Sequence, residues 1–388
     1  MMANLHIATC QAPVNIAVVK YWGKRDEKLM LPVNDSISVT LSTDDLCTTT
    51  SIAASQLFKE DKLVLNGKVE PTNSPRIQNC LKSIQEAARN SGKSPVDPSW
   101  RLQICSKNNF PTSAGLASSA AGYACLVATL QALYKLEGNF SSVARKGSGS
   151  ACRSMFGGFV RWRKGDKSDG SDSVAIQIAP ASHWPEIRVI ICVANDARKD
   201  TGSTSGMQRS VETSDLLRYR AEAIVPRRCD AMEMAILTRD FESFARLTMM
   251  DSNQLHAVCQ DTYPPIRYMN QISWDIVSLV HRYNELVGAN KLAYTFDAGP
   301  NAFLFCLDDD IPEVLQILKQ AFPSNESDYI KGIYTTATAK TTPRSDELAK
   351  RVEPAPAESL KYMITTKIGN GPHEIQQHLC DSKGNTIP

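Results

Sequence analysis

A run of small residues has the composition of a phosphate-binding loop. Residues 108–122 read Asn-Asn-Phe-Pro-Thr-Ser-Ala-Gly-Leu-Ala-Ser-Ser-Ala-Ala-Gly and stand between a predicted strand and a predicted helix. Small side chains let backbone N–H groups approach an anion, and a helix N-terminus adds a favourable dipole. Ser118 and Ser119 could add hydroxyl contacts to phosphate or Mg²⁺. A tightly packed helix start without a ligand fits the composition equally, and the run matches neither the Walker A pattern nor GxGxxG.

Basic and aromatic residues cluster after an apolar segment near the N-terminus. Lys20, Lys24 and Arg25 flank Tyr21 and Trp22. A ligand that carries a diphosphate and a carboxylate needs several cations in one place, and a tyrosine hydroxyl adds a directional donor. The same charges also suit an ordinary solvated strand end. We assign Trp22 to the core.

A second cation has a setting that suits a carboxylate ligand. The segment 147–150, Gly-Ser-Gly-Ser, precedes Arg153, and its small residues bring the backbone close to any bound molecule. The planar guanidinium can grip a carboxylate with two parallel hydrogen bonds, and Ser148 and Ser150 are candidates for further contacts. A surface arginine at a helix start is the alternative.

Two further polar residues are candidates for a site. Asp297 ends a predicted apolar strand directly before the turn 298–301, where an aspartate commonly caps the turn itself. Ser203 lies in a segment rich in glycine and serine, which as an exposed loop needs no ligand. The residues alone leave both roles open.

Composition excludes several classes of protein. The 388 residues carry 43 Lys and Arg against 41 Asp and Glu, and the formal charge of +2 is too small for a nucleic-acid binder that works by bulk charge. The 11 cysteines are dispersed without a CxxC pair, which favours reduced thiols and a cytoplasmic protein. No apolar run approaches the roughly 18 to 20 residues that span a bilayer, so we expect no membrane contact.

The pattern of apolar residues predicts mixed helices and strands. Strands and helices do not alternate strictly, so we expect an α+β protein of two lobes, residues 1–185 and 186–388, and not a doubly wound sheet. Segment 164–173 is expected to be an exposed hairpin or loop, and 338–358 a mobile loop. Beyond a first strand at the N-terminus, the predicted strands are 16–20, 36–41, 47–52, 101–106, 156–163, 187–194, 291–297, 302–307 and 330–335; the predicted helices are 115–136, 215–225, 227–237, 241–250, 275–287 and 312–321.

Five segments resemble motifs of a known enzyme family. Residues 111–122 resemble the Pro-x-x-x-Gly-Leu-x-Ser-Ser motif of the GHMP small-molecule kinase superfamily. Residues 12–26, 147–154, 199–207 and 296–302 resemble motifs of the mevalonate diphosphate decarboxylase family within it, and they occur in the family's order. Asp35 and Ser113 depart from the Ser and Ala that many members carry at those positions.

The resemblance implies a role for each candidate residue. It implies a GHMP-kinase-like fold of two α+β lobes with the active site between them, the first lobe carrying the ATP phosphate loop and the second the catalytic aspartate and the glycine turn. The implied catalytic residues are Asp297, as the base or orienting group, together with Arg153 and Lys24. The implied substrate contacts are Tyr21 and Lys24 with the diphosphate, Arg153 with the carboxylate, and Lys20, Ser148, Ser150 and Ser203 beside them. The implied ATP contacts are Pro111, Ser113, Ala114, Gly115, Leu116, Ala117, Ser118 and Ser119, with Ser119 also a ligand of Mg²⁺.

The implied activity is the ATP-dependent decarboxylation of mevalonate 5-diphosphate to isopentenyl diphosphate, with release of ADP, phosphate and CO₂, in isoprenoid and sterol biosynthesis. The resemblance also implies a homodimer. Three alternatives remain at this point: a kinase of the same superfamily that acts on mevalonate or phosphomevalonate, a decarboxylase that prefers the monophosphate, and a catalytically silent member that senses a ligand.

Overall fold

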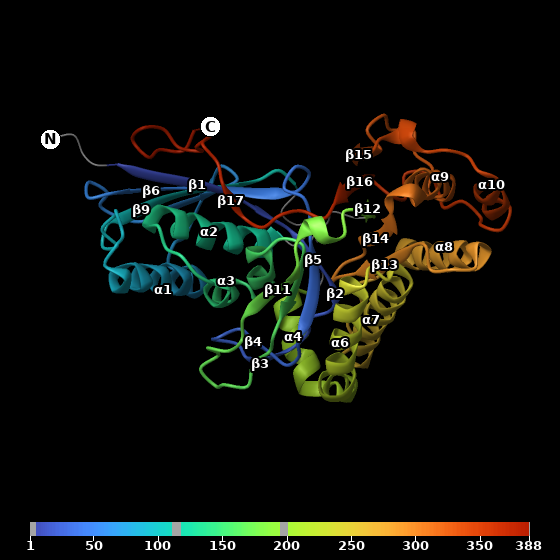
Figure 1. Cartoon of the computed structure of the whole chain (residues 1–388), viewed down its shortest axis with the longest axis horizontal. Helices are drawn as coiled ribbons and strands as arrows, with labels where there is room; N and C mark the ends of the chain where they lie inside the picture. The colour runs from blue at the N-terminus through green and yellow to red at the C-terminus, as the bar shows by residue number, and fades with distance from the viewer. Residues whose placement is uncertain (1–4, 111–117, 195–200, 388) are drawn as a thin grey trace.

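The structure, a computed structural model, describes residues 5–110, 118–194 and 201–387 (Figure 1). The predicted ATP contacts from Pro111 to Ala117 lie outside the described residues. The described residues form three larger sheets with helices packed on them and one two-stranded sheet, so the predicted α+β class is confirmed.

The first sheet has six strands in the order β17-β1-β6-β9-β7-β8. Three helices cover one of its faces (Figure 1). α2 is apolar nearly all round because it lies between this sheet and the other helices, and its alanines allow a close approach to β1 and β6. The elements are β1 (His6–Pro13), β6 (Cys47–Ser55), β7 (Lys62–Leu65), β8 (Lys68–Glu70), β9 (Arg101–Asn108), β17 (His373–Glu374), α1 (Pro75–Ser91), α2 (Ser118–Tyr134) and α3 (Ser141–Gly147).

The second sheet has four antiparallel strands in the order β11-β10-β5-β2. Every residue of β2 and β5 is buried, because α6 and α7 cover the two strands on one side and the 3₁₀ turn Gly149–Met155 contacts them as well. The strands are β2 (Asn15–Val19), β5 (Ser36–Thr40), β10 (Phe159–Trp162) and β11 (Ala175–Ala179), and β3 (Lys24–Asp26) pairs separately with β4 (Leu31–Pro32).

The third sheet has five strands in the order β13-β14-β12-β16-β15. The strands are β12 (Ile187–Val193), β13 (Ala293–Phe296), β14 (Ala302–Leu307), β15 (Ile330–Gly332) and β16 (Tyr362–Lys367). The helices are α4 (Ser203–Thr213), α5 (Asp215–Tyr219), a π-helical turn (Arg220–Ile224), α6 (Val225–Leu237), α7 (Phe241–Asp261), α8 (Gln271–Val287), α9 (Ile311–Ala321) and α10 (Pro343–Ala349); short 3₁₀ turns lie at Ala181–His183, Asp308–Asp310 and Thr336–Thr338.

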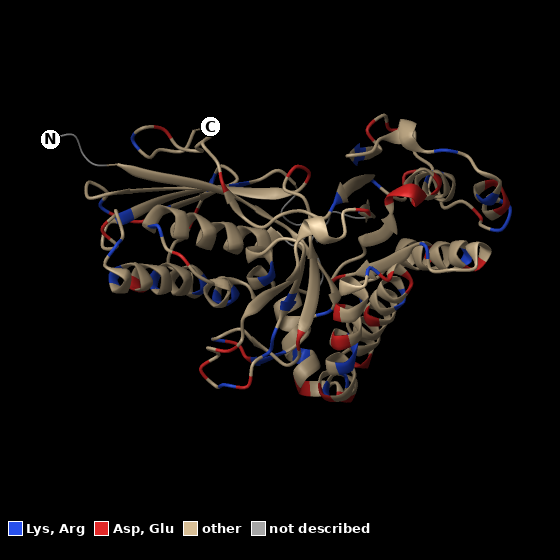
Figure 2. Ribbon diagram, in the orientation of Figure 1, with Lys and Arg blue, Asp and Glu red and all other residues tan. Residues whose placement is uncertain are grey.

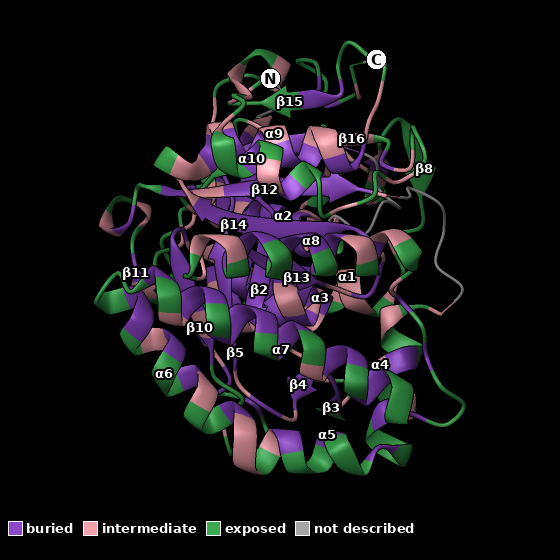
Figure 3. Ribbon diagram, turned by 90° about the vertical axis from the view of Figure 1, so that its right-hand side faces the viewer, coloured by how far each residue is buried: buried purple, intermediate pink, exposed green. Residues whose placement is uncertain are grey.

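One core joins the second and third sheets. A single cluster of buried residues runs from β2 and β5 through β12, β14, α6, α7, α8 and α9. A separate cluster lies between the first sheet and helices α1 to α3. Figure 3 shows how α6, α7 and α8 turn buried residues inward and exposed residues outward. The ends of β2 and β13 therefore meet the middle of α7 inside one packed unit.

Most predicted elements are present. Pro226 stands in the first turn of α6, and Gly288 caps α8 with a φ of 77°, as predicted. The expectation of a loop at 338–358 is wrong in part, because Pro343–Ala349 is a helix that Thr342 starts with a capping box. β17 pairs with β1, so the C-terminal segment returns to the first sheet. The division into lobes at residues 185 and 186 stays a prediction.

The charged side chains and the cysteines are spread over the whole fold. Lys and Arg are interspersed with Asp and Glu over both halves of the molecule (Figure 2). All eleven cysteines are free and buried. In the described ranges no helix is long and apolar enough to cross a membrane.

Candidate active site

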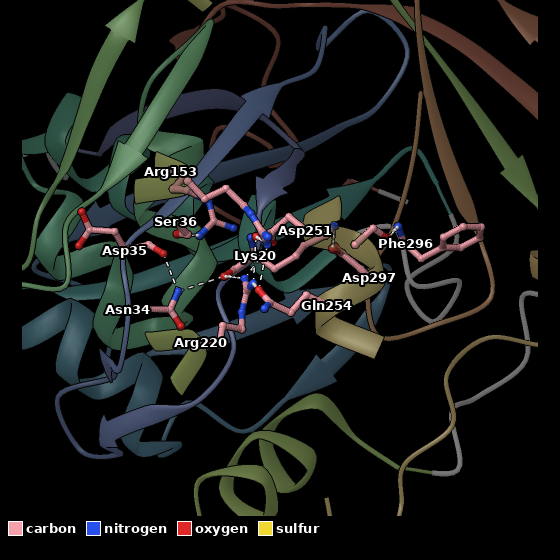
Figure 4. A network of polar contacts seen from close by, with 12 residues as sticks. Lys20, Asn34, Asp35, Ser36, Arg153, Arg220, Asp251, Gln254, Phe296 and Asp297 are labelled. Atoms are coloured by element: carbon pink, nitrogen blue, oxygen red, sulfur yellow. Dashed lines mark hydrogen bonds and ion pairs between the residues drawn. The ribbon is translucent and has the colours of Figure 1, made fainter. Parts of the chain in front are cut away.

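An ion pair joins the first candidate cation to the candidate carboxylate. Lys20 directly follows β2 and Asp297 directly follows β13, and the Lys20 Nζ donates to Asp297 Oδ1 at 2.6 Å (Figure 4). The Lys20 side chain is 2% exposed and that of Asp297 is 36% exposed. Burial lowers the pKa of Lys20, and the neighbouring Asp297 charge opposes that shift. Residues 277 positions apart are thus held in contact, with the carboxylate partly open to solvent.

Arg153 is a buried cation without a carboxylate partner in the described part of the chain. Its Nε donates to Asn15 Oδ1 at 3.2 Å and its Nη1 to Ser36 Oγ at 2.7 Å (Figure 4). The guanidinium lies 5.8 Å from the centroid of the Trp162 ring. Burial lowers its pKa, while the charge of Asp297 raises it. With 3% exposure, the alternative of a surface arginine is wrong, and the site needs an anion to balance this charge.

Tyr21 places a buried hydroxyl against the predicted carboxylate motif. Its Oη has no hydrogen-bond partner among the described residues, and its ring centroid lies 4.6 Å from that of Trp162. A Cβ added at Gly149 would come within 2.9 Å of this hydroxyl, so glycine is required there for the close approach. A buried hydroxyl without a partner in the protein is suited to a ligand.

Lys24 lies in β3 with its side chain 6% exposed, and its nearest carboxylate is Glu27 at 3.9 Å. Burial lowers its pKa; the charge of Glu27 raises it and that of Arg76 lowers it further. Arg76 also lowers the pKa of Tyr21, which burial raises, and its Nη2 donates to Thr204 Oγ1 at 3.4 Å. The positive charge of Arg76 therefore acts on both Lys24 and the neutral hydroxyl of Tyr21.

Arg76 is a residue that sequence reasoning missed. It lies in the first turn of α1, which was not predicted, and no motif surrounds it. The signal that could have found it is the helix start itself, since Ser74 and Pro75 precede an amphipathic run.

The predicted serines lie around the same region. Ser148 Oγ and Ser119 Oγ are 3.3 Å apart, which joins the carboxylate motif to the start of α2. The Ser150 carbonyl accepts from Asn15 Nδ2 at 3.1 Å. Ser203 is the first residue of α4, next to the threonine that Arg76 contacts.

The start of α2 can supply hydroxyl groups to a phosphate or a metal ion. Ser118 and Ser119 are its first residues, and Ser119 is exposed. Within the described ranges no three His, Cys, Asp or Glu side chains group as a metal site. An Mg²⁺ ion that is bound mainly by ATP phosphates needs only one or two protein oxygens, so a serine hydroxyl at this helix start fits such an ion.

Two family models match the chain and leave little of it unmatched. Residues 12–175 match the diphosphomevalonate decarboxylase-like N-terminal domain, and residues 189–375 match the mevalonate 5-diphosphate decarboxylase C-terminal domain. The diphosphomevalonate decarboxylase of Homo sapiens is 53% identical over 393 residues, which cover 98% of this chain and 97% of that protein. The chain belongs to the mevalonate 5-diphosphate decarboxylase family. The family resemblance in the sequence is thereby confirmed.

Solved structures of mevalonate 5-diphosphate decarboxylases share the fold. One crystal structure of such an enzyme is 43% identical, with a TM-score of 0.87, and covers 97% of this chain and 99% of its own. A second, MDDEF in complex with mevalonate diphosphate (MVAPP), the ATP analogue AMPPCP and magnesium, is 28% identical, with a TM-score of 0.74, and covers 96% of this chain and 100% of its own.

The departure at Asp35 from the pattern of mevalonate 5-diphosphate decarboxylases has a structural explanation. Asp35 Oδ2 accepts from Arg161 Nε at 3.0 Å, and its Oδ1 accepts from the Lys164 N–H at 2.8 Å. The carboxylate thus ties β10 and the segment after it to the start of β5. Ser113, the other departure, lies outside the described residues.

Proposed function

We propose that this chain decarboxylates mevalonate 5-diphosphate in an ATP-dependent reaction, with Asp297 and Lys20 at the reacting hydroxyl and Arg153 at the substrate carboxylate. The observation that carries the proposal is the convergence of Lys20, Asp297 and Arg153, which come from three distant segments and leave one buried cation without a countercharge.

The substrate's two anionic ends match two groups of cations. Lys24, Tyr21 and Arg76 suit a diphosphate, which accepts several charge-assisted hydrogen bonds at once. The carboxylate pairs with the free edge of Arg153, with Ser148 and Ser150 beside it. Ser203 at the start of α4 lies on the diphosphate side because its neighbour Thr204 contacts Arg76.

The chemistry then follows in two stages. Asp297 accepts the proton of the 3-hydroxyl while that oxygen attacks the γ-phosphorus of ATP, and ADP leaves with the electron pair of the bond between the γ-phosphorus and the bridging oxygen. Lys20 keeps the carboxylate in place and balances its charge. The bond between the carboxylate carbon and C2 then breaks, its electron pair forms the double bond between C2 and C3, and phosphate leaves with the electron pair of the C3–O bond. CO₂ and isopentenyl diphosphate result. The protein supplies orientation and fixed charges to both stages.

ATP and Mg²⁺ complete the site. The start of α2, Ser118 and Ser119, receives the phosphates together with the segment 111–117, and Ser119 is the protein's candidate ligand for Mg²⁺. Bound with ATP, the ion neutralises phosphate charge. We further propose a homodimer in the cytoplasm, with the ATP loop in a lobe formed by residues 1–185 and Asp297 in a lobe formed by residues 186–388.

A product assay tests this function against the alternatives. Purified protein is incubated with ATP, Mg²⁺ and either mevalonate, its 5-phosphate or its 5-diphosphate, and the organic products are separated by mass. Isopentenyl diphosphate from the diphosphate alone is the expected result. A phosphorylated product that keeps its carboxylate identifies a kinase, preference for the monophosphate identifies the related decarboxylase, and no product from any substrate identifies a silent ligand sensor.

A further inference from the structure

A fully buried ion pair contacts the backbone of Lys20, the residue whose side chain donates to Asp297. Asp251 of α7 and Arg220 of the π-helical turn have side chains with 0% exposure. The Arg220 Nη1 and Nη2 donate to the two Asp251 oxygens at 2.9 and 2.8 Å, and the Arg228 Nη1 donates to Asp251 Oδ2 at 2.8 Å. Both arginines also donate to Gln254 Oε1, at 2.6 and 2.9 Å. Figure 4 shows Asp251, Arg220 and Gln254 of this group next to Lys20.

The ion pair holds the backbone of Lys20 at both of its polar groups. The Lys20 N–H donates to Asp251 Oδ1 at 2.7 Å, and the Lys20 carbonyl accepts from Arg220 Nη2 at 3.2 Å. Asn34 Nδ2 donates to the same carbonyl at 3.1 Å. Lys20 stands just beyond the end of β2, where the sheet no longer fixes the chain. The position of its ammonium therefore depends on these contacts.

Stability alone does not account for this arrangement. Burying charges costs desolvation energy that their attraction recovers only when every polar atom is satisfied. Two arginines surround one carboxylate, and Arg220 Nε is buried with no hydrogen-bond partner among the described residues. Burial by itself raises the pKa of Asp251, but Arg220 and Arg228 outweigh it and hold the pKa below the usual value, so the carboxylate stays charged.

The local backbone of Arg220 is also unusual. Residues Arg220–Ile224 form a π-helical turn between α5 and α6, and such turns are frequent at functional sites. Tyr219 just before it is 60% exposed, whereas Arg220 is fully buried. Arg220 therefore lies on the inward side of this helical segment, the side that also buries Leu217 and Val225.

We propose that Asp251 and Arg220 are positioning residues, which act through the backbone of Lys20 to set its ammonium against Asp297. The inference rests on the proposed function, because it assigns these residues to the same reaction. A catalytic group has to be held within about 0.5 Å of its productive place by the contacts behind it. Asp251 and Arg220 touch neither substrate in this account, and their loss should lower turnover more than substrate binding.

Two matched variants test the proposal, Arg220→Lys and Arg228→Lys. Each keeps a positive charge beside Asp251, but only Arg220 contacts the Lys20 carbonyl. We measure kcat per folded enzyme, the KM for ATP, the KM for mevalonate 5-diphosphate, and the midpoint of thermal unfolding. Arg220→Lys should lower kcat by about tenfold or more, since a displacement near 1 Å can cost on the order of a hundredfold, with KM for ATP within about twofold of the wild type. Arg228→Lys should keep kcat within about twofold.

Glu313→Gln serves as a distant control. Glu313 is also a buried carboxylate that pairs with an arginine, Arg344, but it has no contact with Lys20. It should lower the thermal midpoint and leave kcat unchanged. If Arg220→Lys does not fold, Asn34→Ala decides instead, because it removes a donor to the Lys20 carbonyl without breaking an ion pair; a roughly threefold loss of kcat is expected for one neutral hydrogen bond.

The outcomes separate the two proposals. The positioning role alone is overturned if the wild type releases CO₂ and Arg220→Lys keeps the kcat of the wild type. It is also overturned if the wild type releases CO₂ and the two lysine variants lose kcat equally. An unchanged kcat in Asn34→Ala does the same where Arg220→Lys is not folded. Absence of CO₂ release by the wild type overturns the proposed function and the positioning role with it.

Discussion

Replacing Asp297 by asparagine removes the proposed base while keeping the size of the side chain. A positioned general base contributes about 10²- to 10⁴-fold to a rate, which corresponds to roughly 2.7 to 5.5 kcal/mol of barrier. The amide oxygen of the new side chain could still accept the Lys20 hydrogen bond, but the buried ammonium would lose its countercharge. Because the Asp297 side chain is 36% exposed, we expect a stability cost of about 1 to 3 kcal/mol, less than for a fully buried pair.

The assay for this variant follows CO₂ release and the KM for ATP in the same preparation, after circular dichroism and thermal unfolding have established the fold. The matched control is Asp308→Asn, because Asp308 is 44% exposed and also pairs with one basic side chain, Arg188 at 3.0 Å, away from Lys20. Asp297→Asn should lose at least about a hundredfold in kcat with little change in the KM for ATP, and the control should retain its rate. Activity of Asp297→Asn within about tenfold of the wild type, some 1.4 kcal/mol, would refute the role of the carboxylate.

Three further predictions concern other parts of the site. Arg153→Gln should lower kcat/KM for the substrate by at least about thirtyfold, since it removes a charged partner from a buried carboxylate; an unchanged rate and affinity would remove Arg153 from that role. Gly149→Ala should raise the KM for the substrate about tenfold, because its Cβ would lie 2.9 Å from the Tyr21 hydroxyl, and leave the KM for ATP unchanged; equal effects on both substrates would contradict this reasoning. Burial lowers the pKa of His256 from 6.5 to about 4 in the folded protein, so between these pH values the imidazole is protonated in the unfolded chain and neutral in the folded one. The free energy of unfolding should therefore fall by on the order of 3 kcal/mol as the pH falls from 6.5 to 4. Denaturant titrations at several pH values should show a smaller fall for His256→Gln, and identical pH dependence would contradict the assignment.

The bounds of a helix or strand were predicted correctly from the sequence where one apolar pattern extended over the full length of the element. β14 appears at the predicted residues because its apolar run is continuous and buried. Helix α7 was predicted to end at residue 250, but it continues to Asp261. Its continuation begins with four polar residues that interrupt the apolar pattern, and three of these, Asp251, Ser252 and Asn253, hold Lys20, Phe296 and Tyr294 in place.

The residues of the candidate site also divide into those that the sequence predicted and those that it did not. Lys20, Arg153 and Asp297 stand in motifs that identify the family, and the structure brings Lys20 and Asp297 into contact. Arg76 and Asp251 have no such motif, because their importance comes from contacts between helices and the distant N-terminal segment. Local sequence patterns do not identify the partners in such contacts, but a polar residue that interrupts an apolar pattern indicates where a contact can occur.

The central claim is that one protein both phosphorylates the substrate and removes its carboxylate. The most direct test mixes excess enzyme with ATP, Mg²⁺ and mevalonate 5-diphosphate that carries an isotopic label in the carboxylate, and compares labelled CO₂ with ADP over a single turnover. The account predicts one labelled CO₂ for each ADP, with isopentenyl diphosphate formed in the same amount. ADP and a phosphorylated acid without labelled CO₂ would contradict it.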